Sequence, residues 1–280
     1  TLTPATLPAG NAGTAYSQVL TIAGGIAPYT VTQTGALPTG ITFNAGTRTF
    51  SGTPTQSGTF NISVTVTDST GGTAATVTNN YTLTITVPTL SLTPAAGALP
   101  AGTGGTPYSQ TFTASNGVAP YTYALTAGAL PAGLTLNATT GALSGTPTVA
   151  GSFSFSIRAT DSTTGTAATV TNAYTLAIST PTITVNPPVL PNGIFSVPYN
   201  HVFNAVGGTA PYTFAVSAGA LPAGVTLNAN GNLSGAPTAT GAFNFTIRAT
   251  DALGFTGTRA YTISVVQRPD PSRDPEVRGL

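Results

Sequence analysis

The sequence predicts an all-β protein made of three tandem antiparallel β-sandwich domains. Three observations lead to this expectation. The string APYT occurs at Ala27, Ala119 and Ala210, so the chain repeats itself about every 90 residues. Apolar and polar residues alternate with the period of two that is typical of a half-buried strand. The composition, with 33 Gly, 23 Pro and abundant threonine, favours short strands joined by tight turns.

The length of the repeat sets the domain organisation. A period of about 90 residues is too long for one coil of a solenoid and suits a small domain with its own core. The pattern restarts after Pro88 and after Pro181, which predicts domains at 1–88, 89–181 and 182–267 and a charged, proline-rich tail at 268–280. Because proline stiffens both short linkers, we expect the domains to form an extended rod.

Each repeat is predicted to hold about seven short strands and no helix. Segments such as Tyr108–Ala114 and Tyr121–Leu125 are strand-like and are separated by proline and glycine turns. A longer strand follows in each repeat and leads into an aspartate, and a last strand closes the repeat. In the first repeat, the alternating apolar residues of these two strands are Phe60, Ile62, Val64, Val66 and then Tyr81, Leu83, Ile85.

The composition excludes several classes of function. Only 5% of residues are charged and the net charge is +1, which leaves little to attract nucleic acid. No apolar run is long enough to span a bilayer, so we expect no direct membrane insertion. The absence of cysteine excludes disulfides and thiolate metal sites. A glycosidase needs two neighbouring carboxylates, and each repeat has one aspartate, so we expect no enzyme.

The segment from Thr106 to Gly165 carries the short motifs PY, APYT, LPAGL, SGTP and ATD, which recur in the other repeats unchanged or with one or two substitutions. This set resembles the bacterial Ig-like repeats that are grouped with cadherin-like domains. The resemblance covers all three repeats and implies Ig-like/cadherin-like β-sandwiches. Similar repeats occur in surface adhesins, in autotransporter passengers and as accessory modules of secreted hydrolases.

The tail resembles the segment that joins repeat passengers to a C-terminal outer-membrane domain in some autotransporters. An ordinary interdomain linker is the alternative for these residues. The first interpretation implies an extracellular protein at the bacterial cell surface, tethered to the outer membrane through a region beyond Leu280.

Asp68, Asp161 and Asp251 end the long strand of each repeat and enter a hairpin loop. In cadherins an aspartate at a similar place helps to bind calcium at the joint with the preceding domain, so the resemblance implies calcium as a candidate cofactor here. The acidic linker motifs of cadherins are absent, and calcium requires several oxygen ligands. The alternative is an Asx-type turn, in which the carboxylate bonds to backbone amides and shapes the hairpin.

Tyr29, Tyr121 and Tyr212 follow the proline of each APYT motif and are the best candidates for exposed aromatic rings. Exposed rings can stack on sugars, which makes these residues candidate glycan ligands. The alternative is packing against the core or a turn, because the tyrosines recur in register with the strands.

Together these observations predict a structural stalk segment of a bacterial cell-surface adhesin or autotransporter passenger, which holds a distal adhesive element away from the cell. The first alternative is a binding module for a host or bacterial surface glycan or protein, or for self-association in homotypic adhesion. The second is an accessory repeat region of a secreted polysaccharide-degrading enzyme.

Overall fold

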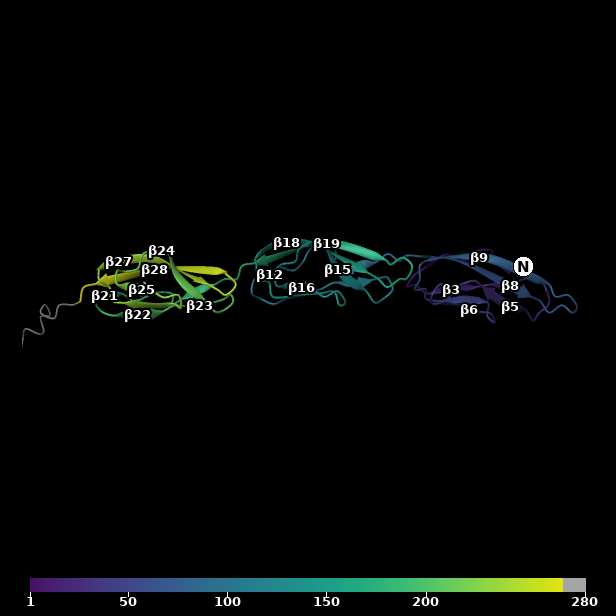
Figure 1. Cartoon of the computed structure of the whole chain (residues 1–280), viewed down its shortest axis with the longest axis horizontal. Coiled ribbons are helices and arrows are strands. Elements are labelled where there is room, and N and C mark those ends of the chain that lie inside the picture. Colours follow the sequence, from purple (N-terminus) through teal and green to yellow (C-terminus); the bar gives the residue numbers. More distant parts are fainter. Residues whose placement is uncertain (269–280) are drawn as a thin grey trace, which may run out of the picture.

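The computed structural model describes residues 1–268 and shows three β-domains arranged end to end as a rod (Figure 1). The predicted tail therefore lies almost wholly outside the described residues. Every regular element of the described chain is a strand, which confirms the all-β prediction. Within residues 1–268 there is no helix that could cross a membrane.

The domains contain nine, ten and nine strands, more than the predicted seven, because several strands are only two or three residues long. Domain 1 holds β1(Leu2–Thr3), β2(Gly10–Asn11), β3(Tyr16–Val19), β4(Thr21–Ile22), β5(Thr30–Thr34), β6(Ile41–Asn44), β7(Thr49–Gly52), β8(Gly58–Thr67) and β9(Thr76–Thr86). Domain 2 holds β10(Ser91–Thr93), β11(Gly97–Ala98), β12(Gly102–Thr103), β13(Tyr108–Thr111), β14(Thr113–Ser115), β15(Thr122–Gly128), β16(Leu134–Leu136), β17(Ala142–Gly145), β18(Gly151–Thr160) and β19(Thr169–Ser179). Domain 3 holds β20(Thr184–Asn186), β21(Gly193–Ile194), β22(Tyr199–Val202), β23(Asn204–Val206), β24(Thr213–Gly219), β25(Val225–Leu227), β26(Asn232–Gly235), β27(Gly241–Thr250) and β28(Thr256–Val266).

Each domain has the same sheets. In domain 1 a four-stranded sheet has the order β2-β9-β8-β5, a three-stranded sheet the order β3-β7-β6, and β1 pairs with β4. Domain 3 repeats this arrangement with β21-β28-β27-β24, β22-β26-β25 and β20-β23. In domain 2 the larger sheet has five strands, because both β11 and β12 pair with β19.

One parallel pairing in domains 1 and 3, and two in domain 2, differ from the predicted antiparallel arrangement. The short strand β2 runs parallel to the last strand β9, and β11, β12 and β21 run parallel to their partners in the same way. The reason is that the chain enters each domain in one small sheet and then crosses to the edge of the larger one. After this crossing it runs in the same direction as the last strand, without a hairpin.

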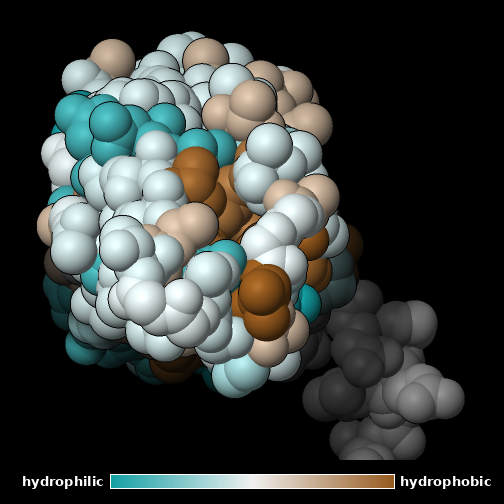
Figure 2. Space-filling view, turned by 90° about the vertical axis from the view of Figure 1, so that its right-hand side faces the viewer, coloured by the Kyte–Doolittle hydropathy of each residue, from teal (hydrophilic) through white to brown (hydrophobic). Residues whose placement is uncertain are grey.

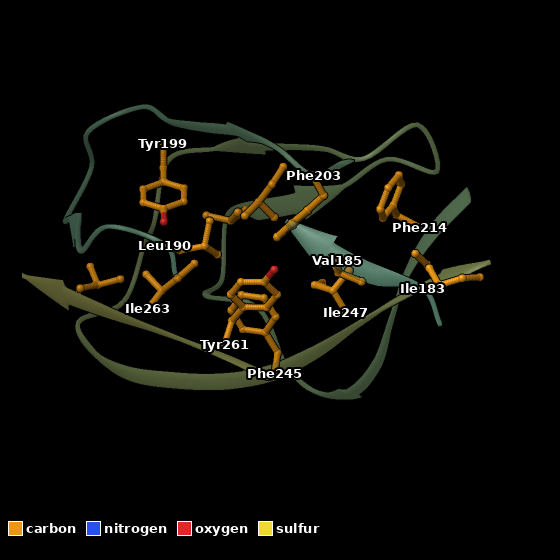
Figure 3. Close-up of a cluster of buried hydrophobic side chains, with 14 residues drawn as sticks. Ile183, Val185, Leu190, Tyr199, Phe203, Phe214, Phe245, Ile247, Tyr261 and Ile263 are labelled. Carbon is orange, nitrogen blue, oxygen red and sulfur yellow. The ribbon is translucent and has the colours of Figure 1, made fainter. Parts of the chain in front are cut away.

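The predicted alternation of the long strands is confirmed. In β8, Ile62, Val64 and Val66 are buried while Asn61 is exposed, and the same pattern recurs in β18 and β27. The inward residues form a separate core in each domain, shown for domain 3 in Figure 3. There the rings of Phe203 and Tyr261 lie 5.2 Å apart, a separation typical of paired aromatic rings in protein cores.

A tyrosine of the last strand fixes the crossing of the N-terminal segment. Its hydroxyl donates a hydrogen bond to a proline carbonyl directly after the first strand, and burial raises the pKa of Tyr174 and Tyr261 in this role. The tyrosine–proline pairs are Tyr81–Pro4 (3.2 Å), Tyr174–Pro94 (2.7 Å) and Tyr261–Pro187 (2.7 Å).

Candidate functional site at the interdomain joints

The three predicted aspartates occupy the same place in each domain, directly after β8, β18 or β27. Their exposed fractions are 9% for Asp68, 6% for Asp161 and 5% for Asp251. A buried carboxylate requires hydrogen-bond donors around it. The neighbouring loops supply these donors, so the aspartates organise the end of each domain that points toward the N-terminus of the rod.

In domain 2 the aspartate joins two loops that are distant in sequence. The backbone N–H of Val118 donates to Oδ2 of Asp161 at 3.0 Å, and the N–H of Ser162 donates back to the Val118 carbonyl at 2.8 Å. The same reciprocal pair exists in the other domains. It joins Asp68 and Ser69 to Ile26 in domain 1, and Asp251 and Ala252 to Thr209 in domain 3.

The second carboxylate oxygen shapes the hairpin loop itself. Oδ1 of Asp161 accepts the N–H of Ala168 at 2.7 Å and that of Thr163 at 3.2 Å, and the Thr163 hydroxyl donates to Oδ2. Burial raises the pKa of Asp161, but these hydrogen bonds outweigh burial and leave the pKa below its ordinary value. In domain 1 the Thr70 hydroxyl, followed by the Ala75 amide, lowers the pKa of Asp68.

These residues do not fit a calcium site of the cadherin type. Calcium takes about six to eight oxygen ligands, usually including several carboxylates. Each domain offers one carboxylate, and both of its oxygens already accept N–H or O–H groups. Within residues 1–268 no group of three or more His, Cys, Asp or Glu side chains could hold a metal ion. The geometry matches the Asx-type alternative.

The three candidate tyrosines lie in the same loops as the residues held by the aspartates. Tyr29, Tyr121 and Tyr212 are each half-buried and pack against the core of their own domain. Their hydroxyls donate to carbonyls of the preceding glycine loops, at Gly24 (3.2 Å), Gly117 (3.1 Å) and Gly207. The three rings are therefore partly covered by their own domains, and glycan stacking by these tyrosines stays a prediction.

Domains 1 and 2 meet at a joint, here called joint 1, that is closed by hydrogen bonds. The N–H of Ser57 donates to the carbonyl of Thr164 at 3.0 Å, and the N–H of Thr164 donates to the carbonyl of Thr55 at 2.9 Å. The N–H of Thr166 donates to Oγ of Ser57 at 2.9 Å. The 161–168 loop thus adds a short parallel bridge to the segment that leads into β8.

Apolar and glycine contacts accompany these hydrogen bonds. Val118, which the aspartate holds in place, packs against the core cluster of domain 1. Gly117 lies so close to Gly13 that a Cβ on Gly13 would be 3.2 Å from the Gly117 carbonyl group. Gly165 has a φ of 83°, and a Cβ there would lie 2.5 Å from the Ser57 carbonyl oxygen. Only glycine suits that position.

Domains 2 and 3 meet at joint 2, which is built differently. The ring of Phe255 lies against Gly104, and the side chains of Leu253 and Thr209 lie over Gly105. Between the described residues of these two domains, the hydrogen bonds of joint 1 have no counterpart. Joint 2 is therefore held by packing alone apart from its covalent linker.

Loop length and one side chain explain the difference. The loop between β18 and β19 spans residues 161–168, whereas that between β27 and β28 spans only 251–255. The shorter loop has no residues at the positions of Thr164 and Thr166. Domain 2 correspondingly has Ala150 at the position of Ser57, so its C-terminal end lacks the hydroxyl that accepts a loop amide at joint 1.

The joint residues were not singled out by the sequence analysis, although two signals exist. Gly13 and Gly105 each lie three residues before the first tyrosine of their repeat, Tyr16 and Tyr108. Glycine at this place allows the close approach of a neighbouring domain. The last hairpin of the third repeat is visibly shorter. Neither signal reveals that Ser57 and Thr164 meet, because these residues are far apart in the chain.

The fold and the joints define a tandem array of Ig-like β-sandwich modules. The family model described as "Putative Ig domain" matches residues 1–88, 89–179 and 177–266, so the chain belongs to this family. The match confirms the resemblance to Ig-like repeats. Repeats of this class are usually non-catalytic and are typical of extracellular proteins.

The chain is also similar to parts of longer solved structures. One is the endo-fucoidan hydrolase MfFcnA4 from glycoside hydrolase family 107, at 20% identity and a TM-score of 0.33 over 94% of this chain and 43% of that one. Another is the protocadherin GammaB4 extracellular domain, at 15% identity and 0.29 over 84% and 45%. A third is the human desmocollin-1 ectodomain, at 12% identity and 0.29 over 86% and 55%.

The chain spans less than two thirds of the length of each of these three structures. TM-scores this low support no statement about function or assembly. Among curated proteins no match is found.

Proposed function

We propose that this chain is a structural stalk segment of a bacterial cell-surface adhesin or autotransporter passenger, and that it holds a distal adhesive element away from the cell. The observation that supports this most directly is joint 1. Three backbone N–H groups and the Ser57 hydroxyl lock domain 2 onto the end of domain 1, and Val118 fills the contact. A stiff link between separate cores is what an extended spacer needs.

The surface supports the same proposal. The described residues carry three aspartates and five arginines, so long-range attraction to charged partners is weak. The outward positions of the long strands are mostly threonine, serine, asparagine and alanine. The chain has no lysine, so trypsin-like proteases find few cleavage sites. The proposed location is extracellular, tethered to an outer membrane through a region beyond Leu280.

Binding of a surface glycan is the alternative function, because the half-buried tyrosines still expose part of each ring. The decisive comparison is small-angle X-ray scattering together with a glycan array on the same 280-residue protein. A stalk gives an extended particle and no saturable glycan binding. Saturable binding that disappears in Tyr121→Ala and Tyr212→Ala, with the domains still folded, would favour the function of a glycan-binding module over that of a stalk.

A further inference from the structure

The N-terminal face of domain 1 has the same features as the face that domain 2 presents to joint 1. This face consists of the loops around Ile26 and residues 69–74, at the end of the rod seen in Figure 2. Ile26 is 57% exposed, and hydrophobic surface is visible among the polar atoms of this end. Its counterpart in domain 2 is Val118, which lies in joint 1 and packs against the preceding domain.

The loop of domain 1 has the same length and the same anchoring as the loop that closes joint 1. It runs from Asp68 to Ala75, as the other runs from Asp161 to Ala168, between strands that correspond. Oδ2 of Asp68 accepts the N–H of Ile26 at 3.2 Å, as Asp161 holds Val118. The domain 1 face is therefore preformed in the geometry of its docked counterpart.

Two glycines show the difference between the docked and the free loop. Gly72 and Gly165 occupy the same position, with φ of 96° and 83°. A Cβ on Gly165 would meet the Ser57 carbonyl of the preceding domain, whereas a Cβ on Gly72 would meet nothing within 4 Å. In this chain the space in front of the domain 1 loop is thus open.

A cavity of about 180 Å³ beside this face indicates how a linker would enter. Its lining includes Thr1, Gly25, Tyr29 and Asp68. In domain 2 the corresponding place is taken by Leu90, which is 6% exposed and touches Gly117. In domain 3, Ile183 is 7% exposed and lies against Gly208 in the same way. Both residues directly precede the counterpart of Thr1, so the cavity lies where one apolar linker side chain would pack.

We propose that this face docks the C-terminal end of another Ig-like repeat, and specifically an end that carries serine at the position of Ser57. The argument for serine comes from the two joints of this chain. The long loop of domain 2 meets Ser57, whose Oγ accepts the Thr166 amide, and the short loop of domain 3 meets the end that carries Ala150. Domain 1 has the long loop. This docking concerns the contact of one repeat with another and does not depend on the stalk role.

The test uses two extended proteins built from the chain itself. In the first, residues 1–90 precede Thr1, so that Leu90 falls directly before Thr1 and an end with Ser57 faces the domain 1 loop. In the second, residues 1–183 precede Thr1, so that Ile183 takes this place and an end with Ala150 faces the loop. Hydrogen exchange of the Gly71 and Thr73 amides reports docking, since they correspond to Thr164 and Thr166.

We expect exchange of these two amides to slow by about tenfold or more in the first protein, relative to the 280-residue chain, and to change little in the second. Gly72→Ala next to the new joint should abolish the slowing, whereas Gly72→Ala in the 280-residue chain should leave Gly71 and Thr73 exchange nearly unchanged. Protection of the Val64 amide of the added domain 1 in the first protein, and of the equivalent Ile157 amide of the added domain 2 in the second, verifies that the facing domain is folded. Equal protection in both extended proteins, or in neither, overturns the proposal.

Discussion

The aspartate that ends each long strand connects local structure to assembly. Asp161 is buried, accepts amides from two loops, and thereby fixes Val118 at the surface that meets domain 1. A single side chain thus sets both the shape of a hairpin and the position of the residue that packs in the joint. The carboxylate has this effect because the buried N–H groups around it have no other acceptor.

Replacing this carboxylate should destabilise domain 2 more than an ordinary surface substitution. For Asp161→Ala we expect a loss of about 3 kcal/mol in the free energy of unfolding, because several buried donors lose their partner. Asp161→Asn keeps one oxygen and should lose less. Differential scanning calorimetry of both variants gives the comparison. Equal stability of Asp161→Ala and the parent protein would show that the loop amides find other acceptors.

The lowered pKa values predict acid sensitivity. The pKa of Asp68 and Asp161 is lower in the folded chain than its ordinary value near 3.8, so folding favours the ionised carboxylates. Their stabilisation is therefore fully present above about pH 4 and is lost as the pH falls below this value. We expect melting temperatures to stay level from pH 7 to about pH 4 and then to fall, and to fall less in Asp161→Asn. A decrease between pH 7 and pH 5 would contradict this assignment.

At the scale of strands and loops, the sequence predicts the longer strands, in which apolar and polar residues alternate with a period of two. The alternation of Phe60, Ile62, Val64 and Val66 places β8 with its correct inward face. The two-residue strands and their parallel pairing could not be predicted in this way, because such short segments have no period of their own. Their position depends on tyrosine–proline contacts between opposite ends of a domain, such as that of Tyr174 with Pro94.

The same limit applies to the joints. The sequence places an aspartate at a hairpin in every repeat, and the structure adds that its partner is the loop before APYT. The contact of Ser57 with Thr164 joins segments more than one repeat apart, and no pattern within one repeat encodes it. The shorter last hairpin of the third repeat can be seen in the sequence, but its length alone does not show that it changes a joint.

A matched pair of glycine substitutions isolates the contribution of the loop to joint 1. Gly165→Ala and Gly72→Ala introduce the same backbone strain, since both residues have positive φ in the same position of their loop. Only Gly165→Ala also pushes a methyl group toward the Ser57 carbonyl. We expect amide exchange of Ser57 and Thr164 to accelerate about tenfold or more, about 1.4 kcal/mol, in Gly165→Ala. Strain within the loop itself is measured by the Ala168 amide in Gly165→Ala and by the equivalent Ala75 amide in Gly72→Ala. If Ala168 exchange accelerates as much as that of Ser57 and Thr164, the effect belongs to loop strain.

At the scale of the whole molecule, calcium should have little effect on the rod. The aspartate oxygens at the joints already accept hydrogen bonds, and the described residues offer no cluster of carboxylates. Small-angle scattering in calcium and then in EDTA should therefore give the same maximum dimension. A rod that becomes shorter or flexible only in EDTA would show that the three aspartates bind metal at the joints, and would favour calcium-regulated adhesion.

The two joints should also differ in stiffness, which gives the rod one firm and one looser link. Joint 1 has a parallel bridge and the Ser57 hydrogen bonds, whereas joint 2 has the packing of Phe255 on Gly104. Because the chain has no cysteine, spin labels can be placed by introducing pairs of cysteines. The exposed residues Thr82, Thr175 and Thr262 occupy equivalent positions in the last strands of the three domains.

Double electron–electron resonance then measures the distance between two spin labels across each joint. The pair Thr82→Cys/Thr175→Cys spans joint 1, and the pair Thr175→Cys/Thr262→Cys spans joint 2. We expect the distance distribution across joint 1 to be the narrower of the two, because its hydrogen bonds restrict rotation of one domain against the next more than the side-chain packing of joint 2 does. Adding Ser57→Ala to the first pair should broaden its distribution toward that of the second. Equal widths in the parent protein would mean that the proline linkers and apolar packing alone set the stiffness, and that the loop hydrogen bonds contribute little to extension.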